Sequence, residues 1–130
     1  MKKNIIILSL LALVIAFSVT ELFVHKHIYT RVYDDLLMVD AQLDVDKDNL
    51  TDSAALQIAD DIVQYWRGRR WWLTSVSNNA IIRLADEHLA RLRAHIAADM
   101  FEDAKVQTAV TIIYFKDLIE EINPRLTNIF

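Results

Sequence analysis

Residues 66 to 72 read Trp-Arg-Gly-Arg-Arg-Trp-Trp, which places three guanidinium groups beside three indole rings. This stretch holds every tryptophan and the only glycine of the chain. Guanidinium groups bind lipid phosphates, and indole rings favour the interface between a membrane and water. We therefore predict that this tryptophan–arginine cluster contacts a membrane surface or a partner protein. Its contact residues are Trp66, Arg67, Arg69, Arg70, Trp71 and Trp72.

A second group of candidate ligands lies in residues 44 to 49, Asp-Val-Asp-Lys-Asp-Asn, which resemble the start of an EF-hand calcium loop. Asn49 stands where such a loop has glycine, and Ala55 stands where it needs a bidentate Glu. We therefore expect weak calcium binding at best. The simpler interpretation is a solvated connection between two helices, in which Asp48 or Asn49 caps the second one.

The remaining polar residues do not form a catalytic constellation. On a helix, His25 and His27 point to nearly opposite sides, and His88 and His95 are about 10 Å apart, so neither pair can hold one ion. The sequence has no nucleotide-binding loop, nucleophile elbow or adjacent His-Glu zinc motif. It also has no cysteine, and therefore no thiol nucleophile. We predict a protein that is not an enzyme and has no catalytic residues, no cofactor and no metal.

The first element that positions these residues is an apolar segment, residues 5 to 24. About 20 helical residues cross a bilayer core. Lys2 and Lys3 precede the segment and should stay in the cytoplasm. We predict a single-pass transmembrane anchor over residues 1 to 24, in the cell membrane, with a cytoplasmic N-terminus. The alternative is a cleaved signal peptide, for which Ala16-Phe17-Ser18 is a passable site.

The remainder, residues 25 to 130, is predicted to be an extracytoplasmic helical bundle. One glycine and one proline in 130 residues disfavour a β-rich fold. A net charge of −4 argues against nucleic-acid binding. The first helix should continue out of the membrane to about Leu43, on an apolar stripe at helical spacing: Ile28, Val32, Leu36, Val39 and Leu43. We predict an all-α antiparallel bundle of about four helices, the first continuous with the N-terminal anchor.

Three further helices follow from the same spacing. The second should start near Asn49 or Thr51, and its stripe is Ala55, Ile58, Ile62, Tyr65, Arg69, Trp72 and Val76. Breaks at residues 77–79 and 99–103 separate it from a third and a fourth helix. The third carries Ile81, Ala85, His88, Leu92 and Ile96. The fourth should end near Asn123, because Pro124 disfavours helix in the residue before it. Its run TAVTIIYF is interpreted as helix buried on two sides, since a lone strand would leave its backbone unpaired.

Folding the second helix back on the first, about Lys47, puts residue 69 level with residue 25. The cluster then lies at the height of the lipid headgroups, where the chain leaves the membrane. Other basic residues join it there: His25, Lys26, His27, Arg31, Arg83 and Arg125. The opposite end should be acidic, with Asp44, Asp46, Asp48, Asp52, Asp99, Glu102 and Asp103. Trp66 and Trp72 also fall on or beside the apolar stripe, which favours core packing for at least one of them.

This pattern resembles a bacterial family of uncharacterised proteins, domain-of-unknown-function family 4363. The resemblance rests on the short N-terminal anchor, on Trp66 and Trp72 at a spacing of six, and on the ending Leu-Thr-Asn-Ile-Phe at residues 126–130. Many members have Asp-His where this chain has Asn78-Asn79. The resemblance implies a Gram-positive, often spore-forming source, and genes adjacent to those of small multi-pass membrane proteins. It implies no catalytic residues.

We therefore interpret the chain as a membrane-anchored extracytoplasmic bundle that acts by binding, as an accessory to an integral membrane protein. The expected partners are membrane lipid and a multi-pass membrane protein. The alternative is a ligand-sensing bundle like the periplasmic part of a chemoreceptor, although the sequence lacks a second membrane helix and a signalling segment. A pocket lined by polar groups would favour sensing, whereas a solid core with a basic, apolar base would favour the accessory role.

Overall fold

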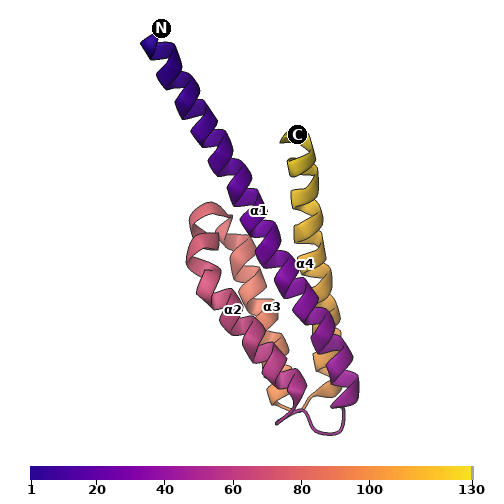
Figure 1. Ribbon diagram of the computed structural model, residues 1–130. Coiled ribbons are helices and arrows are strands. Elements are labelled where there is room, and N and C mark those ends of the chain that lie inside the picture. Colours follow the sequence, from indigo (N-terminus) through magenta and orange to yellow (C-terminus); the bar gives the residue numbers. More distant parts are fainter. Residues whose placement is uncertain (130) are drawn as a thin grey trace.

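The computed structural model describes the backbone of residues 1–129 and the side chains of residues 1–123. This part of the chain forms four helices: α1 (Lys2–Val45), α2 (Ala54–Val76), α3 (Asn79–Ala97) and α4 (Phe101–Ile129). Each helix packs antiparallel on the next one, and α4 also packs on α1 (Figure 1). The helices thus enclose one core, and the predicted all-α antiparallel bundle is confirmed.

The first helix is one uninterrupted element that projects far beyond the other three at its N-terminal end (Figure 1). Its large apolar side chains from Ile5 to Phe17 are each at least 52% exposed. An 18-residue window of α1 reaches a mean hydropathy of 2.6, and α1 is long and apolar enough to cross a membrane. No loop separates the apolar segment from the bundle, so the orientation of one sets the orientation of the other.

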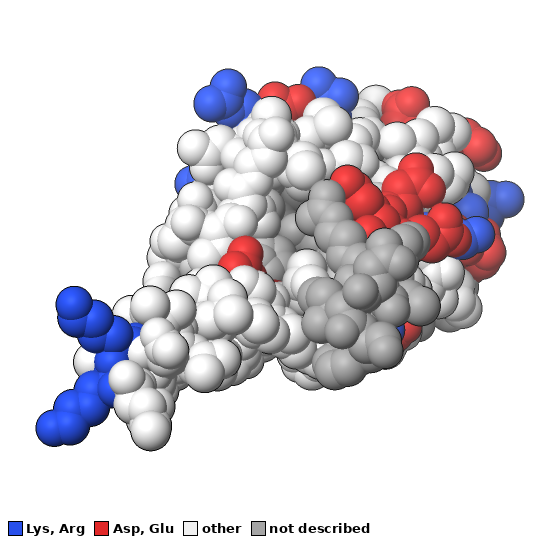
Figure 2. Space-filling view, turned by 90° about the horizontal axis from the view of Figure 1, so that it is seen from above, with Lys and Arg blue, Asp and Glu red and all other residues white. Residues whose placement is uncertain are grey.

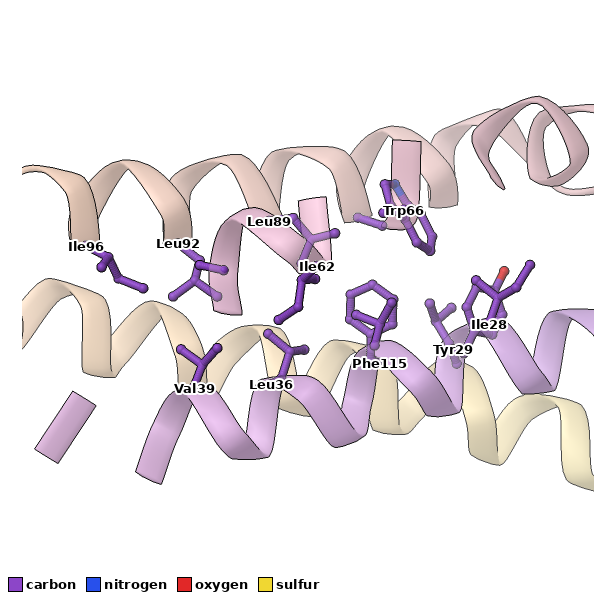
Figure 3. Packing of buried hydrophobic residues seen from close by; sticks show 14 of the residues in the cluster. Ile28, Tyr29, Leu36, Val39, Ile62, Trp66, Leu89, Leu92, Ile96 and Phe115 are labelled. Carbon is purple, nitrogen blue, oxygen red and sulfur yellow. The ribbon is translucent and has the colours of Figure 1, made fainter. Parts of the chain in front are cut away.

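The core lies between the four helices, and its packing near Trp66 is shown in Figure 3. The stripe predicted for the first helix is confirmed, because all five of its members are buried. In α2 the buried side chains are Ala55, Ala59, Ile62, Trp66 and Leu73. The predicted stripe was correct at Ala55 and Ile62. At Ile58, Tyr65 and Trp72 it was one position off, because these side chains are only partly buried and the residue after each is buried instead. In α3, Ala85, Leu92 and Ile96 are buried as predicted, whereas Ile82 and Leu89 are buried in place of Ile81 and His88.

The predicted starting points of the second helix were wrong. The helix begins at Ala54, and its cap is Ser53, whose Oγ accepts a hydrogen bond from the backbone N of Leu56 at 3.1 Å. Asn49 instead accepts from the backbone N of Thr51, within the preceding loop. Asp46 Oδ2 accepts from the backbone N of Ala55 at 3.0 Å. This aspartate therefore stabilises the start of α2, a role that the EF-hand comparison does not suggest.

The turn before the fourth helix is shorter than predicted. Asp99 has a φ of 58°, and α4 begins at Phe101, so residues 101–103 are helical. The Asp99 carboxylate accepts from the backbone N of Leu50 at 2.9 Å, which joins the two loops at this end. The predicted end at Asn123 was also wrong, because α4 continues to Ile129. A proline removes one backbone hydrogen bond and can kink a helix without ending it.

The run TAVTIIYF is helical, as predicted, and one of its faces is buried. Thr108 and Thr111 are buried, and their hydroxyls donate to the carbonyls of Ala104 and Gln107, each at 2.6 Å. These bonds satisfy both hydroxyls inside the core. The prediction of burial on two sides was wrong, because two apolar side chains of the run face outward: Val110 and Ile113.

Candidate functional site

Trp66 lies in the core and is only 2% exposed. Its ring stacks on Tyr29 at 6.3 Å and meets Phe115 edge to face at 5.5 Å (Figure 3). Its Nε1 donates to Asp86 Oδ1 at 2.6 Å. Trp66 therefore offers no surface to a lipid or a partner, and the packing alternative holds for this residue.

Trp72 and Trp71 lie beside the apolar segment of α1. The Trp72 ring is partly buried, and its centroid is 6.4 Å from that of Phe17. Trp71 meets Trp72 edge to face at 6.0 Å and is 69% exposed. Together with the contact between Trp66 and Tyr29, these distances place the cluster next to residues 17–29. This is the level predicted from folding α2 back on α1.

The three arginines of the cluster are exposed, but they differ in their partners. The Arg69 guanidinium lies 3.6 Å from the centre of the Tyr65 ring, and its Nη1 donates to the Tyr65 carbonyl. Arg70 forms an ion pair with Asp86 at 2.9 Å. Arg67 lines a shallow depression between α2 and α3. Because Arg69 and Arg70 already have partners in the bundle, we expect Arg67 to be the freest to meet a lipid phosphate.

A depression of about 310 Å³ beside the α2–α3 turn brings a further arginine to this end. It is lined by Arg70 and Arg83, from different helices, with Thr74, Asn79 and Ile82. Two guanidinium groups and a hydroxyl along one depression favour an anionic group such as phosphate. Arg83 thus adds a positive charge beside the cluster. The sequence predicts Arg83 at the same end of the bundle as the cluster, and the shared depression agrees with this.

Gly68 occupies an open position on α2. A Cβ added there would meet nothing within 4 Å, which excludes a close helix contact as the reason for the glycine. Alanine at a helix interior position is more stable than glycine by roughly 0.5–1 kcal/mol. We therefore expect Gly68→Ala to raise the free energy of unfolding by that amount, as measured by urea denaturation. A loss of stability would show that the backbone at residue 68 needs glycine.

A second feature at this end is the membrane-end cavity, which has a volume of about 320 Å³. It lies between α1, α4 and the α2–α3 turn. Its lining residues are Glu21, Leu22, His25, Tyr29, Val76, Ser77, Asn78, Ile81, Leu118, Glu121 and Ile122. Figure 2 looks down on this end of the molecule, where uncharged side chains dominate and acidic ones gather on one side.

One of the residues that line the cavity is a hydrogen-bonded histidine. His25 is 5% exposed, its Nδ1 lies 2.7 Å from the Glu21 carbonyl oxygen, and its Nε2 lies 2.6 Å from Ser77 Oγ. A carbonyl oxygen can only accept, so Nδ1 carries a proton. In the neutral ring, Nε2 then accepts from the Ser77 hydroxyl. This bond ties α1 to the α2–α3 turn, and it satisfies a polar group that would otherwise be costly to bury.

Tyr29 lines the cavity next to this histidine, and Tyr114 is hydrogen-bonded to the lining residue Ile81. Burial raises the pKa of the Tyr29 phenol, although its hydrogen bond to the Ser77 side chain opposes the change. Burial also raises the pKa of Tyr114 to about 12, and its hydroxyl donates to the Ile81 carbonyl at 2.7 Å. Both phenols therefore stay protonated and serve as donors over the whole physiological pH range.

The charge at this end differs from the prediction. Besides the arginines, it carries the carboxylates of Glu21 and Glu121, which line the cavity. The end of the bundle that was predicted to be basic therefore has two parts. Arginines lie on α2 and α3, and beside them is a cavity whose carboxylates come from α1 and α4. Arg125, predicted to add to the base, has a side chain outside the described residues, as do the residues of the Leu-Thr-Asn-Ile-Phe ending.

Two of the other candidate ligands, Asp44 and His88, have structural partners. Asp44 pairs with Lys105 Nζ at 3.2 Å, across α1 and α4. His88 contacts the amide of Gln107 through Nδ1 at 3.1 Å. Among the described residues, no three His, Asp or Glu side chains converge on a point where they could hold a metal ion.

Sequence reasoning missed the pairing of His25 with Ser77, which are 52 positions apart. Two signals could have found it. His25 was placed where the chain leaves the membrane, and residues 77–79 were placed at the turn that comes down to the same level. Taken together, these two positions predict that the His25 imidazole and the Ser77 hydroxyl lie at the same end of the bundle.

No protein-family model, curated protein or solved structure matches this chain. The resemblance to domain-of-unknown-function family 4363 therefore stays a prediction, and the function is argued from the geometry of this end of the bundle.

Proposed function

We propose that the protein is a membrane-anchored extracytoplasmic helical bundle that acts by binding at the membrane surface, as an accessory to an integral membrane protein. The observation that carries this proposal is the contact between Trp72 and Phe17. Phe17 belongs to a helical stretch whose apolar side chains are all exposed. A continuous apolar surface of this kind is stable in lipid and not in water. The C-terminal turns of α2 then lie where the bilayer begins.

The side chains at this level suit that position. Trp71 is exposed next to Trp72, and indole rings favour the headgroup region. Arg67 and Arg83 lie on the same side of the bundle, where guanidinium groups can bind lipid phosphates. The integral membrane partner is supported by the resemblance, which implies genes adjacent to those of small multi-pass membrane proteins.

Binding to vesicles tests the lipid contact. Among the described side chains, a fragment of residues 25–130 retains all that are buried, because the first of them is His25. We expect this fragment to sediment with vesicles that contain phosphatidylglycerol and to be released as the salt concentration rises. Equal binding to vesicles of pure phosphatidylcholine would contradict an electrostatic contact with anionic lipid.

The side of the membrane can be tested with a single thiol, since the chain has no cysteine. Asp48 is exposed in the loop between α1 and α2, at the far end of the bundle. We expect a D48C variant to react with a membrane-impermeant maleimide in intact cells, because Lys2 and Lys3 favour a cytoplasmic N-terminus. Labelling only after lysis would place the bundle in the cytoplasm. A shortened chain in the cell extract would instead indicate a cleaved signal peptide.

The membrane-end cavity favours a second candidate function, the sensing of a small ligand. Its volume of about 320 Å³ is at the lower end of the range for ligand pockets. The rest of the core is a continuous cluster of buried apolar side chains. The cavity is thus confined to the membrane end, where a ligand would lie between α1, α4 and the turn.

A further inference from the structure

We propose that Ser77 and His25 form a serine–histidine pair that hydrolyses carboxylic esters in the membrane-end cavity. Ser77 is the nucleophile and His25 is the general base. This activity goes beyond the proposed membrane contact, and it differs from the sequence-based prediction that the protein is not an enzyme. It does not involve the tryptophan–arginine cluster, so it can be tested separately from vesicle binding.

The two side chains already have the arrangement that an activated nucleophile needs. His25 Nε2 lies 2.6 Å from Ser77 Oγ, and His25 Nδ1 lies 2.7 Å from the Glu21 carbonyl oxygen. Because the carbonyl can only accept, the proton of the neutral ring is on Nδ1, and Nε2 is left to take the serine proton. A nucleophile within hydrogen-bond reach of a base, which a third group orients, is the general signature of nucleophilic catalysis.

The position of the pair suits a reaction with a bound ester. Both residues line the membrane-end cavity of about 320 Å³. His25 is buried, whereas Ser77 is partly exposed, so the base is shielded from water while the residue that it activates is accessible from the cavity. The Tyr29 phenol lines the same cavity and hydrogen-bonds to the Ser77 side chain, which restrains the hydroxyl.

Backbone donors are available next to the nucleophile. Asn78 follows Ser77 and lines the cavity, and Asn79 begins α3. Among the described residues, neither of their backbone N–H groups has a hydrogen-bond partner. In serine hydrolases with a nucleophile elbow, the backbone N–H of the residue after the serine helps to stabilise the oxyanion. The N-terminal end of α3 adds a partial positive charge at the same place.

In the first half of the reaction, Ser77 Oγ attacks the carbonyl carbon of the ester, and its proton passes to His25 Nε2. The bond from the carbonyl carbon to the alcohol oxygen then breaks, and His25 gives the proton to the departing alcohol. In the second half, water attacks the acylated serine and gives a proton to His25. The bond to Ser77 Oγ breaks, the serine regains its proton from His25, and the carboxylic acid leaves.

The lining determines the class of ester. Because it contains five apolar side chains, the acyl group should be an alkyl chain. These side chains are Leu22, Val76, Ile81, Leu118 and Ile122. The Glu21 carboxylate also lines the cavity, which disfavours an acyl group with a negative charge of its own. Since His25 follows directly after the apolar segment of α1, either a membrane lipid or a small soluble ester can supply this chemistry.

Covalent labelling of the full chain in dodecyl maltoside tests the nucleophile. A fluorophosphonate that carries a fluorophore reacts with activated serines, forming a bond from phosphorus to Oγ and releasing fluoride. We expect it to label Ser77, as located by mass spectrometry of the labelled peptide. Absence of a label on Ser77 in the folded chain would overturn the proposal. Labelling at the same rate in urea would contradict activation by the fold.

Matched variants separate activation by His25 from ordinary serine reactivity. Ser77→Ala removes the nucleophile, and Ser75→Ala removes an exposed serine two residues earlier, whose hydroxyl donates to the Trp71 carbonyl. We expect the first change to abolish labelling and the second to leave it unchanged. His25→Asn keeps a donor for the Glu21 carbonyl but removes the base, so the labelling rate should fall about a hundredfold. If this variant is folded and is labelled as fast as the parent, the proposal is wrong.

Hydrolysis of p-nitrophenyl hexanoate needs only the two serine variants and does not depend on the stability of His25→Asn. We expect the parent and Ser75→Ala to hydrolyse it, and Ser77→Ala to show only the rate in buffer. The parent should hydrolyse p-nitrophenyl acetate with a kcat/KM about tenfold lower, because that acyl chain loses four methylene groups that the apolar lining can bury. If Ser77→Ala is as active as the parent, Ser77 is not the nucleophile.

Two further substrates distinguish the sources of the ester. The release of hexanoate from dihexanoyl phosphatidylcholine is compared with its release from ethyl hexanoate. Faster hydrolysis of the phospholipid assigns the site to membrane lipids, and the reverse order assigns it to soluble esters. If neither is hydrolysed although Ser77 is labelled, the serine is reactive without carrying out the proposed reaction, and the proposal is overturned. None of these outcomes affects the vesicle assay.

Discussion

Replacing Trp66 with alanine will lower the free energy of unfolding by roughly 3 to 5 kcal/mol, the usual cost of truncating a buried tryptophan. The ring is 2% exposed and lies between Tyr29 on α1 and Phe115 on α4. Its removal leaves a cavity that three helices would have to close. It also removes the donor to Asp86, which retains Arg70 as a partner.

The measurement is urea denaturation of residues 25–130, followed by circular dichroism. Trp71→Ala is the matched control, because it removes the same side chain five residues further along α2, where 69% of it is exposed. We expect that control to change the stability by less than about 1 kcal/mol. If the two variants unfold at the same urea concentration, Trp66 does not have the central packing role assigned to it.

Replacing Arg67, Arg69 and Arg70 with glutamine will weaken the binding of residues 25–130 to phosphatidylglycerol vesicles by about a hundredfold. Each arginine near an anionic surface contributes about 1 kcal/mol, and about 1.4 kcal/mol corresponds to a factor of ten. Arg70 should contribute least of the three, because its charge is paired with Asp86. The helix content should be preserved, since glutamine is a good helix former.

The control for this variant is a change of equal type on α3. Arg91 and Arg93 lie more than three turns from the start of α3, on the part of the bundle away from the apolar segment of α1. Replacing Arg91 and Arg93 with glutamine should weaken vesicle binding far less than replacing Arg67 and Arg69 with glutamine. If the triple variant binds vesicles as tightly as the parent, the arginines are not a lipid contact. A protein partner would then be the remaining role for their exposed groups.

The sequence was sufficient for the number and order of the helices, because apolar spacing and a few breaks define them. The stripe of α1 was predicted correctly, since Ile28, Val32, Leu36, Val39 and Leu43 recur at the three- and four-residue spacing of one helix face. In α2 two adjacent stripes are both apolar, one through Tyr65 and Trp72 and the other through Trp66 and Leu73. The helix packs on both α1 and α3, and only that packing decides which stripe enters the core.

Details that depend on side chains far apart in the chain could not be predicted. Asn49, Thr51 and Ser53 can each cap a helix, and Ser53 does so here. The choice follows from Asp46, which binds the backbone N of Ala55, and from Asp99, which binds that of Leu50. The height of the tryptophan–arginine cluster was predicted from simple counting. The acidic cavity next to it was not, because its wall is completed by α4.

In the proposed membrane-anchored arrangement, the unbroken helix α1 would join the bundle rigidly to the segment that lies in the lipid. Residues 25–45 add roughly 30 Å of helix at 1.5 Å per residue. A flexible linker would let the bundle change its position relative to the apolar segment, but α1 continues from one to the other without a linker. Any tilt or rotation that a neighbour imposes on the apolar segment is therefore transmitted to the loops at the far end. In the proposed arrangement, the same stiffness would keep the bundle within about 30 Å of the membrane surface, where its partners would have to lie.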